Sequence, residues 1–140
     1  MANEALANLA RIGQLKSEAQ NPAELQRMLK QAKTRWADAQ IMAASVDGRF
    51  TSVYGAAHAA ALAALRWHGY RSENRFIVFQ CLPHTLGWAA PRWRVLDAAH
   101  QKRNLAEYEG YLDIEESMVL ELVALVRDLI DDVEKLVLGR

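Results

Sequence analysis

Four side chains that can bind an anion or move a proton lie between residues 100 and 107. If this segment is helical, a rotation of about 100° per residue places His100, Arg103, Asn104 and Glu107 in one sector. Arginine offers a planar fork of donors to phosphate oxygens, and asparagine offers both donors and an acceptor. The spacing therefore predicts a polar face for binding a nucleotide or RNA. His100, Arg103, Glu107 and the nearby Tyr108 are the candidates for any catalysis there.

The other side of this segment is small or apolar and is expected to pack against the protein: Val95, Ala98, Leu105 and Ala106. Leu96 departs from the pattern because it falls inside the polar sector. The simplest interpretation of the polar face is exposed surface carrying an Arg103–Glu107 pair, worth about 0.2–0.5 kcal/mol. The face is a binding site only if its arginine recognises a ligand.

The same segment is locally basic although the chain has no net charge. It carries Arg92, Arg94, Lys102 and Arg103, against 17 basic and 17 acidic residues in the whole chain. Nonspecific nucleic-acid binding usually needs a positive excess, so any such binding must use a local patch. We predict that Arg103, Asn104, His100 and Lys102 contact the nucleotide or RNA. Trp88 and Trp93 either stack on bases or, more simply, pack the connection at Pro91 onto the core.

Several classes of chemistry have no support in the sequence. No histidine pair has metal-ligand spacing, no glycine-rich phosphate loop is present, and the one cysteine, Cys81, lies in an apolar run and is expected to be buried. We therefore expect no metal and no cofactor. We also expect no signal peptide and no membrane span, and thus a cytoplasmic protein.

Apolar periodicity and abundant alanine predict an all-α fold, an antiparallel up-and-down bundle of five to six helices in a single domain, residues 1–140. The Ala-rich third helix is expected at the centre of the bundle, after a break at Asp47-Gly48, and Pro83 is expected to kink or end the fourth. Asn21 and Asp113 are predicted N-caps of the second and last helices. The expected helices run over residues 4–19, 22–44, 49–68, 73–86 and 91–110, with a long amphipathic helix after residue 113.

Several motifs, in order, resemble those of the HEPN (higher eukaryotes and prokaryotes nucleotide-binding) family. They are Arg49-Phe50-x-x-x-Tyr54, Gly69-Tyr70-Arg71, Leu86-Gly87 and Arg103-Asn104-x-x-Glu107-Tyr108, followed by the last amphipathic helix. The resemblance covers most of the chain and implies a bundle of helices that acts as a homodimer. Active members of the family resemble one another as metal-independent ribonucleases. Their motif is an arginine, often followed by a polar residue, with four to six residues between the arginine and a histidine.

That histidine is missing after Arg103-Asn104, because residues 108, 109 and 110 are Tyr, Glu and Gly. A tyrosine, with a pKa near ~10, is a poor base at neutral pH. In a second register, Arg94 precedes His100 at the required spacing, but a valine stands where the polar residue is expected. The resemblance also implies that a paired nucleotidyltransferase antitoxin can modify a tyrosine near the motif, here Tyr108 or Tyr111.

Three hypotheses follow from these observations. The first is a non-catalytic HEPN-like module that binds a nucleotide, RNA or a partner as a homodimer, in a toxin–antitoxin or phage-defence pair. The second is a metal-independent ribonuclease that uses Arg103 or Arg94 with a non-standard acid or base. The third is a structural protein that assembles through its apolar helix faces.

Overall fold

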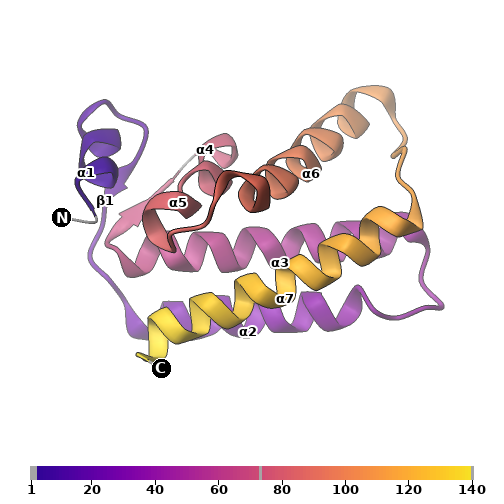
Figure 1. Ribbon diagram of the computed structural model, residues 1–140, viewed down its shortest axis with the longest axis horizontal. Coiled ribbons are helices and arrows are strands. Elements are labelled where there is room, and N and C mark those ends of the chain that lie inside the picture. The colour runs from indigo at the N-terminus through magenta and orange to yellow at the C-terminus, as the bar shows by residue number, and fades with distance from the viewer. Residues whose placement is uncertain (1–2, 73, 140) are drawn as a thin grey trace.

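Three long helices run side by side and form the body of the protein (Figure 1). The computed structural model describes residues 3–72 and 74–139, and these three helices are α2 (Pro22–Asp38), α3 (Val46–Trp67) and α7 (Glu116–Leu138). Helices α3 and α7 run in the same direction and α2 runs against them. The all-α prediction is confirmed; α2 and α3, which are consecutive long helices, are antiparallel, and α3 and α7 are parallel neighbours.

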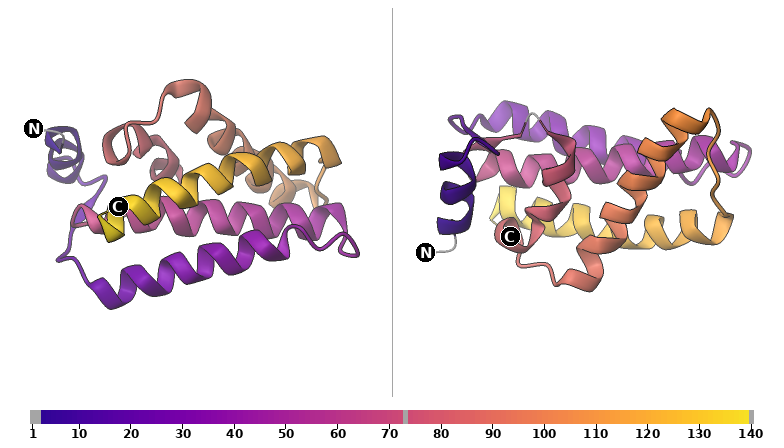
Figure 2. Two further views of the ribbon diagram at one scale, coloured as in Figure 1. Left: turned by 60° about the horizontal axis from the view of Figure 1, so that its bottom comes forward. Right: turned by 90° about the horizontal axis from the view of Figure 1, so that it is seen from above.

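The remaining helices cover one side of this layer. Figure 2 shows α6 crossing the long helices obliquely, with the short α4 and α5 before it in the chain. A small N-terminal unit lies at one end and pairs two short antiparallel strands, with Lys16 opposite Arg71 and Ser17 opposite Tyr70. The bounds of these elements are α1 (Glu4–Arg11), β1 (Lys16–Ser17), β2 (Tyr70–Arg71), α4 (Arg75–Gln80), α5 (Leu82–Thr85) and α6 (Ala90–Glu109).

Helix α3 is the central helix, as its alanines predict. Small side chains let neighbouring helices approach closely, and α3 contacts α2, α7, α4, α5 and α6. Six of its alanines are buried: Ala56, Ala57, Ala60, Ala61, Ala63 and Ala64. Because α2 and α6 both pack against α3, side chains from these two helices meet beside it.

Local capping explains where α2 and α3 begin. The Asn21 side chain accepts a hydrogen bond from Glu24 N at 3.2 Å, with Pro22 in the first turn, as predicted. Ser45 caps α3 in the same way, accepting from Gly48 N at 3.0 Å. The predicted break at Asp47-Gly48 is therefore wrong, because both residues lie in the first turn of α3. The chain breaks earlier, after α2 ends at Asp38.

Other predicted boundaries also need correction. The N-cap of α7 is Glu115 rather than Asp113, and its first residue, Glu116, pairs with buried Arg49 at 2.8 Å. The predicted fourth helix is divided at Cys81, and Pro83 lies in the first turn of α5, in agreement with the expected kink. Glu73, the predicted start of that helix, lies outside the described residues.

The first helix ends eight residues earlier than predicted, at Arg11 instead of Ala19. Gly13 adopts a φ of 81°, which only glycine reaches readily, and turns the chain toward β1. Leu15 is then buried with Leu6, Leu65 and other residues in a second apolar cluster, separate from the main core. Burial of Leu15 and pairing of β1 with β2 thus outweigh continuation of the helix.

Candidate functional site

The side of α6 that is buried against the protein is opposite to the side that its sequence pattern predicts. His100 is 1% exposed and is buried together with Leu96 and Ala99. Leu105, expected to pack against the protein, is 53% exposed. The polar sector therefore faces α3, and Leu96, which departed from the predicted pattern, marks the buried side.

His100 is held on both sides of its ring by polar partners. Its Nδ1 lies 2.8 Å from Tyr54 Oη, and Asn104 Nδ2 lies 3.1 Å from its Nε2. Both ring nitrogens of His100 are therefore within hydrogen-bond distance of a polar side chain. His100 lies beneath the surface, so it positions its neighbours and has no direct access to a ligand.

Arg103 lies at the edge of this hydrogen-bonded chain. Its guanidinium carbon is 5.3 Å from the centroid of the Tyr54 ring, within the range of a cation–π contact. Its Nη1 is 3.1 Å from Glu107 Oε1, so the ion pair expected from the i, i+4 spacing is present. The Arg103 side chain is 32% exposed. The ring of Tyr54 and the carboxylate of Glu107 therefore hold Arg103 while leaving part of it open to solvent.

Arg103 lines a cleft of about 350 Å³ that α2, α3 and α6 form together. From α2 the cleft receives Arg35, and from α3 it receives Tyr54 and His58. No carboxylate in residues 3–72 or 74–139 forms an ion pair with Arg35. The cleft thus brings together two arginines from different helices, and only Arg103 has an acidic partner.

The other predicted site residues lie away from this cleft. Lys102 donates from Nζ to Asp113 O at 2.9 Å and lines a separate groove with Asn104 and Tyr108. Tyr108 is 91% exposed, so it is not part of the hydrogen-bonded chain around His100. Tyr111 is 62% exposed. Of the predicted ligand contacts, Arg103 alone lines the cleft.

The second register, Arg94 with His100, is not assembled. Arg94 is exposed and its guanidinium lies 5.7 Å from the centroid of the Trp93 ring, whereas His100 is buried against Tyr54. Trp88 is 4% exposed, packs in the core and donates from Nε1 to Asp132 at 2.8 Å. Of the two roles expected for Trp88, the structure therefore shows packing in the core. The ring of Trp88 is not available for stacking with a base.

Sequence reasoning missed the contributions of α2 and α3 to the cleft. Arg35 and His58 gave no signal, because residues so far apart in sequence become neighbours only when α2, α3 and α6 pack together. Tyr54 did give a signal, since it ends the motif Arg49-Phe50-x-x-x-Tyr54. Arg49, from the same motif, is 2% exposed and joins the end of α2 to the start of α7 through Ala39 O and Glu116.

Metal ligands and membrane spans were also sought in the described part of the chain. Residues 3–72 and 74–139 contain no cluster of three histidine, cysteine or acidic side chains that could hold a metal ion. None of the helices over the same residues is long and apolar enough to cross a bilayer. Cys81 is buried, as predicted, and burial raises the pKa of its thiol to about 11.

Comparison with known proteins adds no relative. No protein-family model matches the chain, and searches of curated proteins and of solved structures find no match either. The geometry of the cleft is therefore the basis for a functional proposal.

Proposed function

We propose that the chain is a non-catalytic HEPN-like module that binds a phosphate group of a nucleotide or RNA in the cleft between α2, α3 and α6. The observation that carries this proposal is the approach of Arg35 and Arg103, from two helices, to one cleft. Guanidinium groups bind phosphate oxygens through charge-assisted hydrogen bonds. Tyr54 and Glu107 fix Arg103 before a ligand arrives, which lowers the entropy cost of binding.

The proposal involves no catalysis by the residues that the sequence suggested for it. Ribonuclease chemistry without a metal needs a group that exchanges a proton near neutral pH. Among those residues, His100 is buried and Tyr108 lines a separate groove. Binding requires only the two arginines.

Salt-dependent binding of a short fluorescein-labelled single-stranded RNA tests the proposal. We expect Arg103→Ala and Arg35→Ala each to weaken binding about tenfold or more, because a hydrogen bond to a charged group contributes about 1.5–3 kcal/mol. Each substitution should also reduce the log–log salt slope by about 0.7. Arg94→Ala is the matched control, since Arg94 is exposed on the same helix but lies outside the cleft. Equal losses in all three variants would contradict the proposed site.

One observation favours a second candidate function, a ribonuclease. His58 lines the same cleft as Arg103 and could act as the base on a ribose 2′-hydroxyl. In this case RNA would be cleaved, and both Arg103→Ala and His58→Gln would abolish cleavage without preventing folding. Intact RNA after prolonged incubation with the wild-type protein would exclude this candidate and leave the binding module.

The resemblance extends the proposal to partners. We infer from it a homodimer and a toxin–antitoxin or phage-defence pair with a nucleotidyltransferase, for which the exposed hydroxyls of Tyr108 and Tyr111 are accessible acceptors. Light scattering at micromolar concentration tests the dimer. Intact-mass measurement after co-expression with an adjacent nucleotidyltransferase gene tests the modification, and an unchanged mass counts against it.

A further inference from the structure

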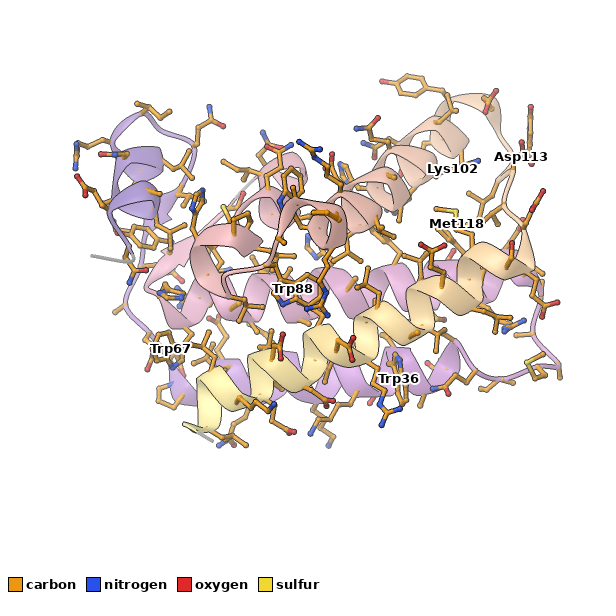
Figure 3. All side chains as sticks on the ribbon, in the orientation of Figure 1. Trp36, Trp67, Trp88, Lys102, Asp113 and Met118 are labelled. Atoms are coloured by element: carbon orange, nitrogen blue, oxygen red, sulfur yellow. The ribbon has the colours of Figure 1, made fainter. Side chains whose placement is uncertain are left out.

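A second surface, distinct from the cleft, lies where the end of α6 approaches the start of α7. It is a groove of about 630 Å³ whose apolar lining comes from Ala98, Leu105 and Tyr108 of α6 and from Met118 of α7. Figure 3 places Lys102, Asp113 and Met118 together at this end of the molecule. Leu105 is 53% exposed and Tyr108 is 91% exposed, so the chain itself leaves much of this apolar surface uncovered.

Four residues of α6 that line the groove, three of them apolar or aromatic, form one stripe. Ala98, Gln101, Leu105 and Tyr108 are spaced three and four residues apart, so they lie on one side of the helix. The opposite side of α6 buries Leu96 and His100. An exposed stripe of this kind on a helix whose other side is already packed is typical of an interaction surface.

The segment that joins the two walls of the groove is acidic. From Asn104 to Val126 the chain has no lysine or arginine and six acidic residues: Glu107, Glu109, Asp113, Glu115, Glu116 and Glu121. Glu107 pairs with Arg103, and Glu116 pairs with Arg49. The other four form no ion pair within the described residues. The one cation in the lining, Lys102, is held by the backbone oxygen of Asp113 at 2.9 Å.

We propose that this groove binds a basic amphipathic helix of a partner protein. An apolar lining between two helices fits the apolar face of a third, which binds through side chains at helical spacing. Four carboxylates without ion-pair partners select lysine and arginine on the polar face of the bound helix. A second copy of the chain would bring an equally acidic segment to the groove, and like charges oppose such contacts.

The test is fluorescence anisotropy on the full chain with three labelled helical peptides. The first has leucines on one face and lysine and arginine on the other. The second keeps the leucines and replaces every basic residue with glutamate, and the third keeps the basic residues and replaces the leucines with serine. We expect the first peptide to bind at least tenfold more tightly than either of the others.

Substitutions in the protein locate the binding. Leu105→Ser should weaken binding of the first peptide at least tenfold through loss of apolar contact, and Glu109→Gln combined with Glu121→Gln should weaken it and reduce its salt dependence. The matched controls are Leu138→Ser, at the far end of α7, and Glu4→Gln, in α1; both are exposed and should leave binding unchanged.

Three outcomes would overturn the proposal. The first is equal binding of the basic and acidic peptides, and the second is binding that Leu105→Ser does not alter. The third is a dimer in sedimentation equilibrium that Leu105→Ser dissociates, which would assign the groove to a second copy. Absence of binding by the first peptide likewise rejects it.

Discussion

The contact between Tyr54 and His100 is the polar interaction that most directly determines how α6 packs on α3. Its two atoms are 2.8 Å apart, and both residues are at least 95% buried. A buried polar group that loses its partner carries the cost of desolvation without compensation. This hydroxyl therefore contributes, beside the apolar packing of Leu96 and Ala99, to the orientation of α6 and the position of Arg103.

We predict that Tyr54→Phe lowers the free energy of unfolding by about 1–3 kcal/mol, because the aromatic ring remains but the hydrogen-bond partner of buried His100 Nδ1 is lost. Urea denaturation followed by circular dichroism measures this change. Tyr108→Phe removes the same atom from a side chain that is 91% exposed and should shift stability by less than about 0.5 kcal/mol. Equal midpoints for the two variants would show that the contact does not stabilise the fold.

The orientation of α6 also shows what periodicity cannot predict. His100 and Asn104 were placed on an exposed face because they are polar, yet α3 offers Tyr54 as a partner that makes burial of His100 acceptable. Such a partner is 46 positions away in sequence and becomes visible only in three dimensions. The Arg103–Glu107 pair, by contrast, was predictable, since it depends only on spacing within one helix.

At the scale of elements, buried Arg66 joins α3 to the N-terminal segment. It is 1% exposed and donates to Glu24 Oε1 at 2.7 Å and to the backbone oxygens of Glu18 and Ala19. Arg71 of β2 adds bonds to both glutamates. Hydrogen bonds from Arg71 and Arg66, respectively, are the largest causes that lower the pKa of Glu18 and of Glu24.

This cluster predicts acid sensitivity. A carboxylate whose pKa is lower in the folded state stabilises the fold at pH values above its ordinary 4.5, and that stabilisation is lost as the pH falls through the folded-state value. The melting temperature of the wild type should therefore fall steeply below pH 4.5. Glu24→Gln should lower stability by about 1.5–3 kcal/mol at pH 7 and flatten the acid limb of a plot of melting temperature against pH.

The control for this experiment is Glu121→Gln, at an exposed glutamate of α7 that forms no ion pair in the described part of the chain. This variant should retain the wild-type pH profile. An acid limb that is equally steep in Glu24→Gln and in the wild type would mean that other carboxylates govern acid unfolding.

The same cluster explains why element boundaries were only partly predictable. Central α3, the N-cap at Asn21 and the break near Pro83 depend on local sequence and were predicted. The early end of α1 depends on Arg66 and Arg71, which bind the backbone and side chains near Glu18. Long-range contacts of this kind override the apolar spacing of residues 6–15, which by itself favours a longer helix.

On the scale of the whole molecule, the apolar interior has two parts. The main core joins α2, α3, α6 and α7, and the second cluster contains Leu6, Leu15, Leu65, Ile77 and Cys81. The two parts share α3, but α1 contributes buried side chains only to the second. Local opening free energies vary across a protein, and a small peripheral cluster is expected to open before the main core.

Cys81 reports this opening, because its raised pKa and its burial keep the thiol unreactive in the closed state. Leu6→Ala should leave a cavity worth about 2–5 kcal/mol in the second cluster and accelerate labelling of Cys81 by a disulfide reagent at least tenfold. If the two parts are separable, hydrogen exchange in the middle of α7 should change little in Leu6→Ala.

The control is Leu129→Ala, in the main core. This variant should accelerate exchange in α7 and labelling of Cys81 together, since the second cluster packs on α3. Uniform acceleration of exchange by Leu6→Ala would show instead that the chain unfolds as one cooperative unit, with α1 as an integral part of it.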